Sequence, residues 1–461
     1  MDDGVLGGPS QSEGDTNLTG RRAAWQARAL DARARALLAR DAAAFLHQSV
    51  STPCLNVIAK AEGIWIEDTA GRRYMDFHGN NVHHIGYGHP RLKRAIAEQM
   101  EALSFAPRRY ACDVAVELAE KLAAISPGGL SKVLFTTGGS DAVEVAVKLA
   151  RAATGRFKTL SFWDAFHGAG IGASALSGEA LFRSGPVAPV VAGAQHVAPF
   201  ACYRCPYGHE VDEQGQPMLD RCHMACASMV EYVLAREGDV AAVIAEPARA
   251  VPYLAPHGYW QRVREACARH GALLIFDEIP TGLGKTGRMF ACEHDAVAPD
   301  ILVMGKALGG GILPIAAVLA RPELDVAGAW AFGHYTHEKN PVTARAALTT
   351  IEIIEDEGLV ENAARIGAMA LERLVSMKRV MPAIGDVRGR GLLIGIELVR
   401  GGSDKVPDEA LAEAVMYRAL DRGLSFKVTM GNVLTLTPPL TVTEAEMMRG
   451  LDILEEAIGA G

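Results

Sequence analysis

Between residues 90 and 350 the chain alternates between two patterns of hydrophobic positions. In one pattern apolar residues recur three or four positions apart, which is typical of helices that bury one face. This pattern predicts helices at 92–102, 114–124 and 142–153. In the other the apolar run is short and continuous, and it predicts strands at 132–137, 159–163, 240–247, 272–278, 300–306 and 315–320. Such alternation predicts an α/β fold with helices on both faces of a mostly parallel sheet.

The sequence on either side of this region has a different pattern. Residues 21–46 predict one helix, and 63–68 and 73–77 flank a Gly-containing turn that predicts a β-hairpin. Near the other end, 344–377 and 408–421 are helical in pattern, and the strand-like stretches are GDVRGRGLLIGIELVR, LSFKV and NVLTLT. These segments predict a smaller α+β part.

We therefore expect four parts along the chain. They are a disordered tail at 1–20, an N-terminal segment of helix and hairpin at 21–89, a large domain at 90–350 and a small C-terminal domain at 351–461. The Gly/Ser-rich, acidic composition of the tail is the reason to expect disorder there.

Composition narrows the choice of partners and compartment. The 461 residues are 49% hydrophobic, which suits a large packed core. The net charge of −8, without a Lys/Arg block, argues against a nucleic-acid partner. No apolar run approaches the roughly 18 residues of a membrane-spanning helix, so we expect no membrane partner. Eight cysteines and an N-terminus unlike a signal peptide predict a cytoplasmic protein with reduced thiols.

Three predicted strands end in polar residues that carry chemistry. ALLIFDE ends in Asp277 and Glu278, DILVMGK ends in Lys306 shortly before three glycines, and KVLFTT runs into Gly138-Gly139-Ser140 at the start of a helix. Ligands of open α/β sheets bind outside the carboxyl ends of the strands. A glycine-rich helix start favours a phosphate, a partly desolvated lysine suits a Schiff base, and a buried aspartate can keep a pyridine nitrogen protonated.

From about residue 50 onward the chain resembles a class III aminotransferase of the type I pyridoxal-phosphate (PLP) fold. The motifs that carry the resemblance are DEIPTGLGKTG, MGKALGGGILPIAAV, GGSDAVEVAVKLAR, AFHG and VRGRGLLIGIEL. The family fold has a large domain and a small α+β domain built from both ends of the chain.

The resemblance implies a role for each matching residue. Lys306 is the expected Schiff-base lysine and proton shuttle, and Asp277 the partner of the pyridine nitrogen. The other cofactor-binding residues it implies are Gly139 and Ser140 at the phosphate, Phe166 stacked on the ring, His167 beside it, Glu246 near Asp277, and Thr336 reaching the phosphate from the second subunit. The family's sites form at the interface of a homodimer.

Three departures from the family pattern bear on the reaction. Pro280 replaces a glutamine expected near the cofactor's 3′ oxygen, and His337-Glu338-Lys339 follow Thr336 where the family has an aromatic residue and two glycines. Thr435 stands where members that use glutamate or 2-oxoglutarate often carry an arginine. Threonine cannot clamp a carboxylate bidentately, so 2-oxoglutarate-linked transamination loses support.

The pattern as a whole, including YMDFHGNNVHHIGYGHP and CYRCPYG, most resembles a subgroup of this family that includes an ammonia-lyase. We expect β-elimination from a small primary amine, a hydroxylated aminoalkylphosphonate or a related anionic amine. Basic side chains are the candidate contacts to its anionic group: Arg108, Arg109, Lys339 and Lys427. The alternatives are an aminotransferase that uses pyruvate or 2-oxoglutarate and a non-catalytic, cofactor-binding regulatory domain.

Four cysteines form a cluster in the sequence. Cys202 and Cys205 are followed, sixteen residues later, by Cys222 and Cys226. This spacing is near that of structural zinc loops. Reduced loop thiols are the expectation, with no metal, and zinc is the alternative.

Overall fold

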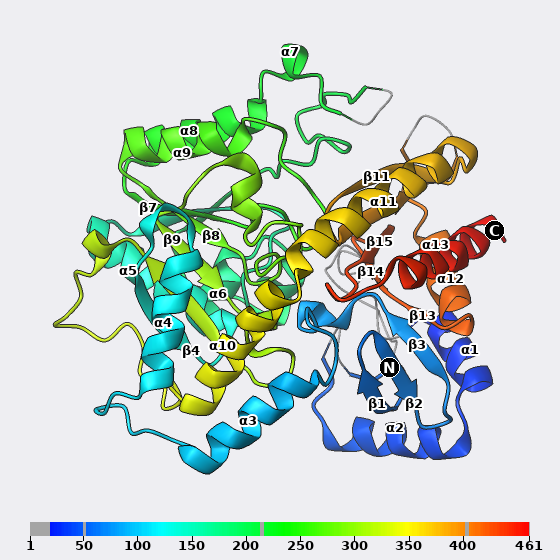
Figure 1. The fold of residues 1–461 in the computed structure, drawn as a ribbon. Helices are drawn as coiled ribbons and strands as arrows, with labels where there is room; N and C mark the ends of the chain where they lie inside the picture. Colours follow the sequence, from blue (N-terminus) through cyan, green and yellow to red (C-terminus); the bar gives the residue numbers. More distant parts are fainter. Residues whose placement is uncertain (1–18, 49–51, 213–215, 402–404, 461) are drawn as a thin grey trace.

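The computed structural model describes residues 19–48, 52–212, 216–401 and 405–460 (Figure 1). Its helices are α1 Gly20–Ala29, α2 Ala32–Ala44, α3 Pro90–Ala102, α4 Asp113–Ile125, α5 Gly139–Thr154, α6 Ile171–Leu176, α7 Leu219–Cys222, α8 Ala225–Glu237, α9 Tyr259–His270, α10 Pro341–Asp356, α11 Leu359–Val380, α12 Glu409–Asp421 and α13 Glu444–Gly459. Its strands are β1 Ile58–Glu62, β2 Trp65–Asp68, β3 Arg73–Asp76, β4 Lys132–Thr136, β5 Lys158–Phe162, β6 Ala194–Val197, β7 Val240–Ala245, β8 Leu273–Asp277, β9 Ile301–Met304, β10 Ala316–Ala320, β11 Ile384–Arg390, β12 Leu393–Leu398, β13 Leu424–Ser425, β14 Lys427–Thr429 and β15 Val433–Leu436.

The largest sheet has seven strands in the order β4-β10-β9-β8-β7-β5-β6. Neighbouring strands from β9 to β6 are parallel, and β10 is antiparallel to both of its neighbours. All strands except β10 therefore run in one direction and bring their carboxyl ends to one edge. Strand β7 is buried at every position, as a strand covered on both faces should be.

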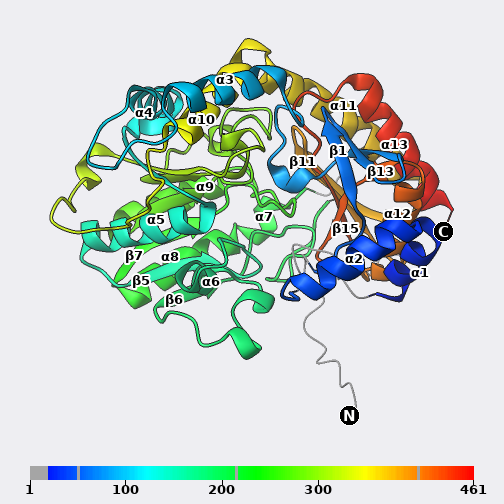
Figure 2. The same cartoon turned by 90° about the horizontal axis from the view of Figure 1, so that it is seen from below.

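Helices cover both faces of this sheet, as the alternating pattern predicts. Helices α5 and α6 pack on one face, and α4, α8, α9 and α10 lie on the other (Figure 2). The expected α/β class is confirmed.

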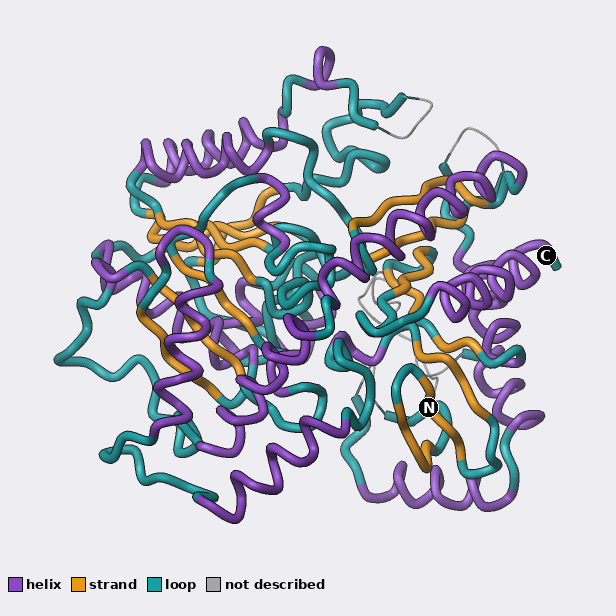
Figure 3. Tube along the Cα trace, in the orientation of Figure 1, coloured by secondary structure: helices purple, strands orange, loops and turns teal. Residues whose placement is uncertain are grey.

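A second part is built from both ends of the chain. Strands β1, β2 and β3 form an antiparallel sheet, and β13, far along the sequence, pairs with β3 in parallel. A further sheet has the order β11-β12-β15-β14. Figure 3 shows the strands of this part beside the helices near both termini, and α12 contacts both α1 and α13. The expected small α+β part from N- and C-terminal segments is present.

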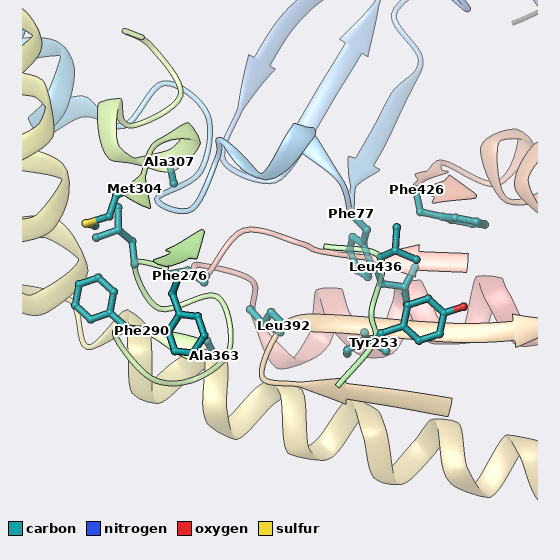
Figure 4. Close-up of a cluster of buried hydrophobic side chains, with 14 of the residues drawn as sticks. Phe77, Tyr253, Phe276, Phe290, Met304, Ala307, Ala363, Leu392, Phe426 and Leu436 are labelled. Atoms are coloured by element: carbon teal, nitrogen blue, oxygen red, sulfur yellow. The ribbon is translucent and has the colours of Figure 1, made fainter. Parts of the chain in front are cut away.

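Buried apolar side chains connect the two parts without a break. The cluster includes Phe276 of β8 and Met304 of β9, and it continues to Phe77 after β3 and Leu436 of β15 (Figure 4). Burial of apolar area drives the two parts together, so they share one core.

Two predicted helices are each two helices in the structure. The predicted helix at 21–46 breaks between α1 and α2, where Asp31 accepts a hydrogen bond from the amide of Ala34 and caps the second helix. The predicted helix at 344–377 breaks at Gly358, whose φ of 61° is left-handed. Helical spacing continues across both breaks, so the hydrophobic pattern alone did not reveal them.

Other differences are smaller. The unpredicted elements are the strands β1 and β6 and the helices α6, α7, α8, α9 and α13. Strand β9 ends at Met304, so Lys306 lies beyond the strand rather than in it. Of the expected tail at 1–20, residues 1–18 lie outside the described residues, whereas Thr19 caps α1 and Gly20 begins it. None of the helices in the described ranges is long and apolar enough to cross a membrane.

Gly367 of α11 tests the packing of this helix on the turn between β11 and β12. A Cβ at Gly367 would lie 2.1 Å from the carbonyl oxygen of Gly391, a backbone atom that cannot rotate away. We expect Gly367→Ala to destabilise the protein by about 1–3 kcal/mol, measured by urea unfolding. Gly328→Ala is the control, because a Cβ there meets nothing within 4 Å. Equal stability of the two variants would contradict this packing.

Candidate active site

Lys306 and Asp277 lie at the same edge of the seven-stranded sheet. Asp277 ends β8 and pairs in register with Val303 of β9, and Lys306 follows β9 by two residues. Lys306 has a φ of 45°, a left-handed conformation that is rare for a residue with a side chain. Such strain is found mainly where the surrounding structure holds a functional group in place.

Asp277 is buried and held by hydrogen bonds. Its Oδ2 accepts a hydrogen bond from Nδ1 of His167 at 2.8 Å, and its Oδ1 accepts one from the amide of Ile279 at 3.1 Å. His167 is itself fixed, because its amide donates to Oγ of Ser177 at 3.0 Å. A carboxylate oriented in this way can face a cationic ring nitrogen without reorganising.

The start of α5 forms a cradle for an anion. Gly138 offers no side-chain cap, so the first amides of this 16-residue helix remain available to a ligand. Oγ of Ser140 accepts a hydrogen bond from the amide of Ala169 at 3.0 Å. Gly168, with a φ of 128°, packs so closely on this serine that a Cβ would lie 2.6 Å from Oγ. The glycine of the AFHG motif therefore allows the two loops to meet.

A cavity of about 200 Å³ opens beside Lys306. Segments from across the chain line it, and the residues used below are His78, Asn81, Phe166, Lys306, Lys427, Thr429 and Thr435. Phe166 packs against Phe182 with ring centroids 4.6 Å apart. Lys427 supplies a second amine on the wall of the cavity.

Glu246 lies next to this cavity rather than on its wall. Its Oε2 accepts a hydrogen bond from the amide of Ala250, a lining residue, at 2.8 Å. Its Oε1 lies 3.7 Å from Nε of Arg249, which also pairs with Glu179 at 4.0 Å. All three charged side chains are buried, so Glu246 fixes the loop that carries Ala250.

The structure brings some expected residues together and places others elsewhere. Lys306, Phe166 and Lys427 line the cavity, and Asp277 and His167 pair beside the same sheet edge. Gly139, Ser140 and Glu246 do not line the cavity, although Glu246 bonds to the lining residue Ala250. Four further expected residues lie away from the cavity wall in the single chain: Thr336, Arg108, Arg109 and Lys339.

Those four residues lie in the α3–α4 connection and in the 334–340 loop. Arg108 forms an ion pair with Glu338 at 3.7 Å. Glu338 is one of the three ionisable residues that follow Thr336. Arg109 lies over the ring of Tyr110, and the carbonyl of Lys339 accepts a hydrogen bond from Cys112. Thr336 is exposed.

Sequence reasoning missed His78 and Asn81 as site residues. Both lie in the HGNN segment, where Asn80 and Asn81 have φ values of 47° and 59°. Asn81 is buried, and its Oδ1 has no hydrogen-bond partner among the described residues. Consecutive asparagines after a His-Gly pair are a signal of such left-handed backbone, and this signal could have marked the loop.

Behind the site, Lys285 connects the aspartate loop to the C-terminal strand. The fully buried Nζ donates hydrogen bonds to the carbonyls of Pro438 at 2.7 Å and Thr437 at 3.4 Å. Burial lowers the pKa of Lys285 to about 7, and Asp76 opposes this shift. Burial likewise raises the pKa of Glu278 to about 7, against hydrogen bonds from the amides of Ala291 and Cys292.

The cysteine cluster forms one small apolar cavity. Cys202, Cys205, Cys222 and Cys226 line it together with His209, and its volume is about 20 Å³. Burial, then the neighbouring thiols, raises the pKa of Cys202 to about 12. Among the described residues no group of three or more His, Cys, Asp or Glu side chains is arranged to hold a metal ion.

These features fit PLP: an anion cradle at a helix start, a buried carboxylate, an aromatic face and a lysine, all at one sheet edge. The fold and the site define a PLP-dependent enzyme of the type I fold. The chain belongs to the class III aminotransferase family, whose model matches residues 47–458. The expected cofactor and enzyme class are thereby confirmed.

Three similar proteins illustrate the range of the family. The (R)-1-hydroxy-2-aminoethylphosphonate ammonia-lyase of Vibrio splendidus (strain 12B01) is 44% identical over 455 residues, which cover 97% of this chain and 95% of that protein. The leucine/methionine racemase of Thermococcus litoralis is 40% identical over 418 residues, 88% of this chain and 90% of that one. The solved structure of a Bacillus anthracis aminotransferase has a TM-score of 0.85 at 32% identity, and covers 94% of this chain and 100% of that chain.

Gly168→Ala tests the anion cradle. The added Cβ would displace Ser140, the second residue of α5, and with it the first turn of the helix. We therefore expect PLP to bind the apoenzyme about tenfold or more weakly, the loss of one hydrogen bond to a charged group. Titration of apoenzyme with PLP, followed by absorbance, measures this. Gly155→Ala is the control. Gly155 also has a positive φ, of 67°, but a Cβ there meets nothing within 4 Å and the residue lies at the other end of α5. Unchanged affinity in Gly168→Ala would contradict the assignment.

Lys285→Met tests the buried amine through pH. Folding lowers the pKa of Lys285 from 10.5 to about 7, so between these values the unfolded chain binds more protons than the folded one. The contribution of Lys285 therefore makes stability rise with pH across this window. We expect urea unfolding at pH 7 and pH 9 to show a smaller rise in Lys285→Met than in the wild type. Lys60→Met, at an exposed lysine, should keep the wild-type rise, and a Lys285→Met protein that does the same would contradict this pKa.

Proposed function

We propose that the protein is an ammonia-lyase that acts on a small hydroxylated aminoalkylphosphonate. The observation that carries the proposal is the pairing of Lys306 and Lys427 in one cavity of about 200 Å³. Lys306 can remove a proton from the carbon that bears the substrate's amino group, and Lys427 is suited to bind an anionic group elsewhere on the same substrate. The 44% identity to an ammonia-lyase of this substrate type supports the same reaction.

Bound PLP supplies the electron sink that acidifies the carbon next to the substrate nitrogen. Lys306 takes the proton from that carbon, and Asp277 keeps the ring nitrogen positively charged. If the neighbouring carbon carries a hydroxyl group, the C–O bond can break and the oxygen leaves with the bonding electron pair. The Lys306 ammonium returns its proton to that oxygen, which leaves as water. Hydrolysis of the remaining unsaturated amine then gives ammonia and an aldehyde.

Transamination is the competing outcome, and the site offers it less support. A 2-oxoglutarate-linked aminotransferase needs a clamp for the second carboxylate of its keto acid. Thr435, at the position where such enzymes often carry an arginine, is buried, and its hydroxyl is hydrogen-bonded to that of Thr429 at 2.7 Å. This pair is neutral and cannot replace a guanidinium. The geometry therefore favours elimination.

We further propose that two copies share their active sites. A groove of about 680 Å³ beside α4 is lined mostly by apolar residues, together with Glu120, Ser131, Glu338 and Lys339, and Trp330, nearby in the sequence, is 80% exposed. An exposed apolar surface of this kind suits a second protein surface. In such a dimer Thr336, Arg108, Arg109 and Lys339 would serve the partner's cavity. All eight cysteines are free thiols, which supports a reducing, cytoplasmic environment.

Ammonia release without a keto acid tests the proposed reaction. Purified holoenzyme given (R)-1-hydroxy-2-aminoethylphosphonate alone should release many equivalents of ammonia per active site. Lys306→Ala should release none, because no other amine in the cavity replaces its position. Substrate conversion that stops after one equivalent without free ammonia, leaves the amino group on the cofactor with a shifted absorbance spectrum, and resumes on addition of pyruvate would identify an aminotransferase and overturn the lyase.

A further inference from the structure

His78 is the one imidazole on the wall of the Lys306 cavity among the described residues. Its backbone is held on both sides: its amide donates to Oδ1 of Asp76 at 3.0 Å, and its carbonyl accepts from Oγ1 of Thr437 at 3.2 Å. The backbone of His78 is therefore held between the end of β3 and the end of β15, which fixes where the ring begins. None of the roles assigned above uses it.

The hydrogen bonds of the ring determine which nitrogen can donate. Nδ1 accepts a hydrogen bond from the amide of Asn80 at 3.2 Å. In a neutral imidazole one nitrogen accepts and the other carries the proton, so the proton lies on Nε2. Within the described residues Nε2 has no hydrogen-bond partner, and it remains available to a ligand in the cavity.

The charges around His78 keep the ring neutral. Burial, followed by the positive charges of Lys427, His83 and Lys306, lowers the pKa of His78 well below its usual value of 6.5. The ring is thus a donor at Nε2 throughout the physiological pH range. His78 lines the same cavity as Lys427 and Lys306.

We propose that the Nε2–H group of His78 binds the hydroxyl oxygen that leaves the substrate. This inference rests on the proposed lyase function. A substrate that extends from Lys306 to Lys427 carries its hydroxyl between its amino group and its phosphonate. His78 lines the same cavity as both amines and offers a donor there, so in this proposal it is both a catalytic and a specificity-determining residue.

The chemical step is balanced without any further reactant. Lys306 takes a proton from the amine-bearing carbon, and the C–O bond of the next carbon breaks with both electrons on oxygen. His78 donates a hydrogen bond to that oxygen while the negative charge develops, and the Lys306 ammonium supplies the proton that turns it into water. A donor placed where charge develops lowers the barrier more than it strengthens ground-state binding.

Other polar residues of the cavity fit this role less well. The hydroxyl groups of Thr429 and Thr435 bond to each other. Lys427 is the cation suited to the phosphonate, and the buried polar atom of Asn81 without a partner is its acceptor, Oδ1. A leaving oxygen needs a donor, and His78 has one.

The experiment separates proton removal from departure of the hydroxyl group. His78→Phe keeps a flat ring and removes the donor, and His78→Gln restores an N–H group. Each holoenzyme is incubated in ²H₂O with the hydroxylated phosphonate and, separately, with 2-aminoethylphosphonate, which has no hydroxyl group. Ammonia is assayed, and NMR follows exchange of hydrogen at the amine-bearing carbon. The cofactor absorbance of each variant reports whether the site is intact.

We expect His78→Phe to lower ammonia release by about 100-fold, the usual loss for one charge-stabilising donor. Exchange with 2-aminoethylphosphonate should stay at the wild-type rate, and His78→Gln should recover part of the ammonia release. Lys427→Met, in contrast, should raise the KM of both compounds.

Three results would count against these assignments. Undiminished ammonia release by His78→Phe would overturn the role of His78 and leave the proposed function intact. Equal losses of exchange with both compounds would overturn it as well, because they would mean a general structural role. A wild type that releases no ammonia would overturn the proposed function, and this inference with it.

Discussion

The parallel pairing of β8 with β9 is the constraint on which the site depends. Its register places Asp277 opposite Val303, and the amide of Glu278 continues the ladder by donating to the carbonyl of Val303 at 2.9 Å. Two turns that leave the sheet side by side then carry the carboxylate and the lysine. Because a slip of one residue would reverse the direction of every side chain on the strand, this register is also what keeps Asp277 and Lys306 on the cavity side.

A second constraint joins the ends of the chain to this edge. The amide of Thr437 donates to the carbonyl of Phe77 at 2.6 Å, and β13 pairs with β3. Lys285 holds the same segment, just after β15, by donating a hydrogen bond to the carbonyl of Pro438. These contacts bring His78 and Lys427 to one cavity. The seven-stranded sheet therefore carries Asp277 and Lys306, and the smaller part carries most of the residues proposed to meet the substrate.

The difference between these two halves explains what the sequence could predict. Asp277, Lys306 and Ser140 follow continuous apolar runs, and the rule that parallel strands end at one edge is enough to group them. His78 and Asn81 have no such local signal of function, because their position depends on a pairing across more than 340 residues, between β3 and β13. Sequence reasoning could name Lys427 only as one of four candidate cations, and it had no means to separate it from Arg108.

Local signals also explain the errors in the fold. The breaks at Asp31 and Gly358 fall inside helical spacing that continues on both sides, so caps and backbone conformation, rather than hydrophobicity, decide them. Strand β6 has the sequence AQHV, which is too short and too polar to stand out, and it forms because β5 offers it a parallel partner. In each case a cap, a left-handed residue or a neighbouring strand decides the structure, and the spacing of hydrophobic residues does not encode any of these.

The pairing of β3 with β13 also orders events in time. A ribosome makes Lys306 and the glycine cradle well before it makes Lys427 and Thr437, and domains form largely as their segments emerge. When all seven strands and the glycine-rich start of α5 have been made, the part of the cavity wall that carries Lys427, Thr429 and Thr435 does not yet exist. Because the two parts share one core, the sheet gains its last buried neighbours, and the cavity its second amine, only with the final strands of the chain.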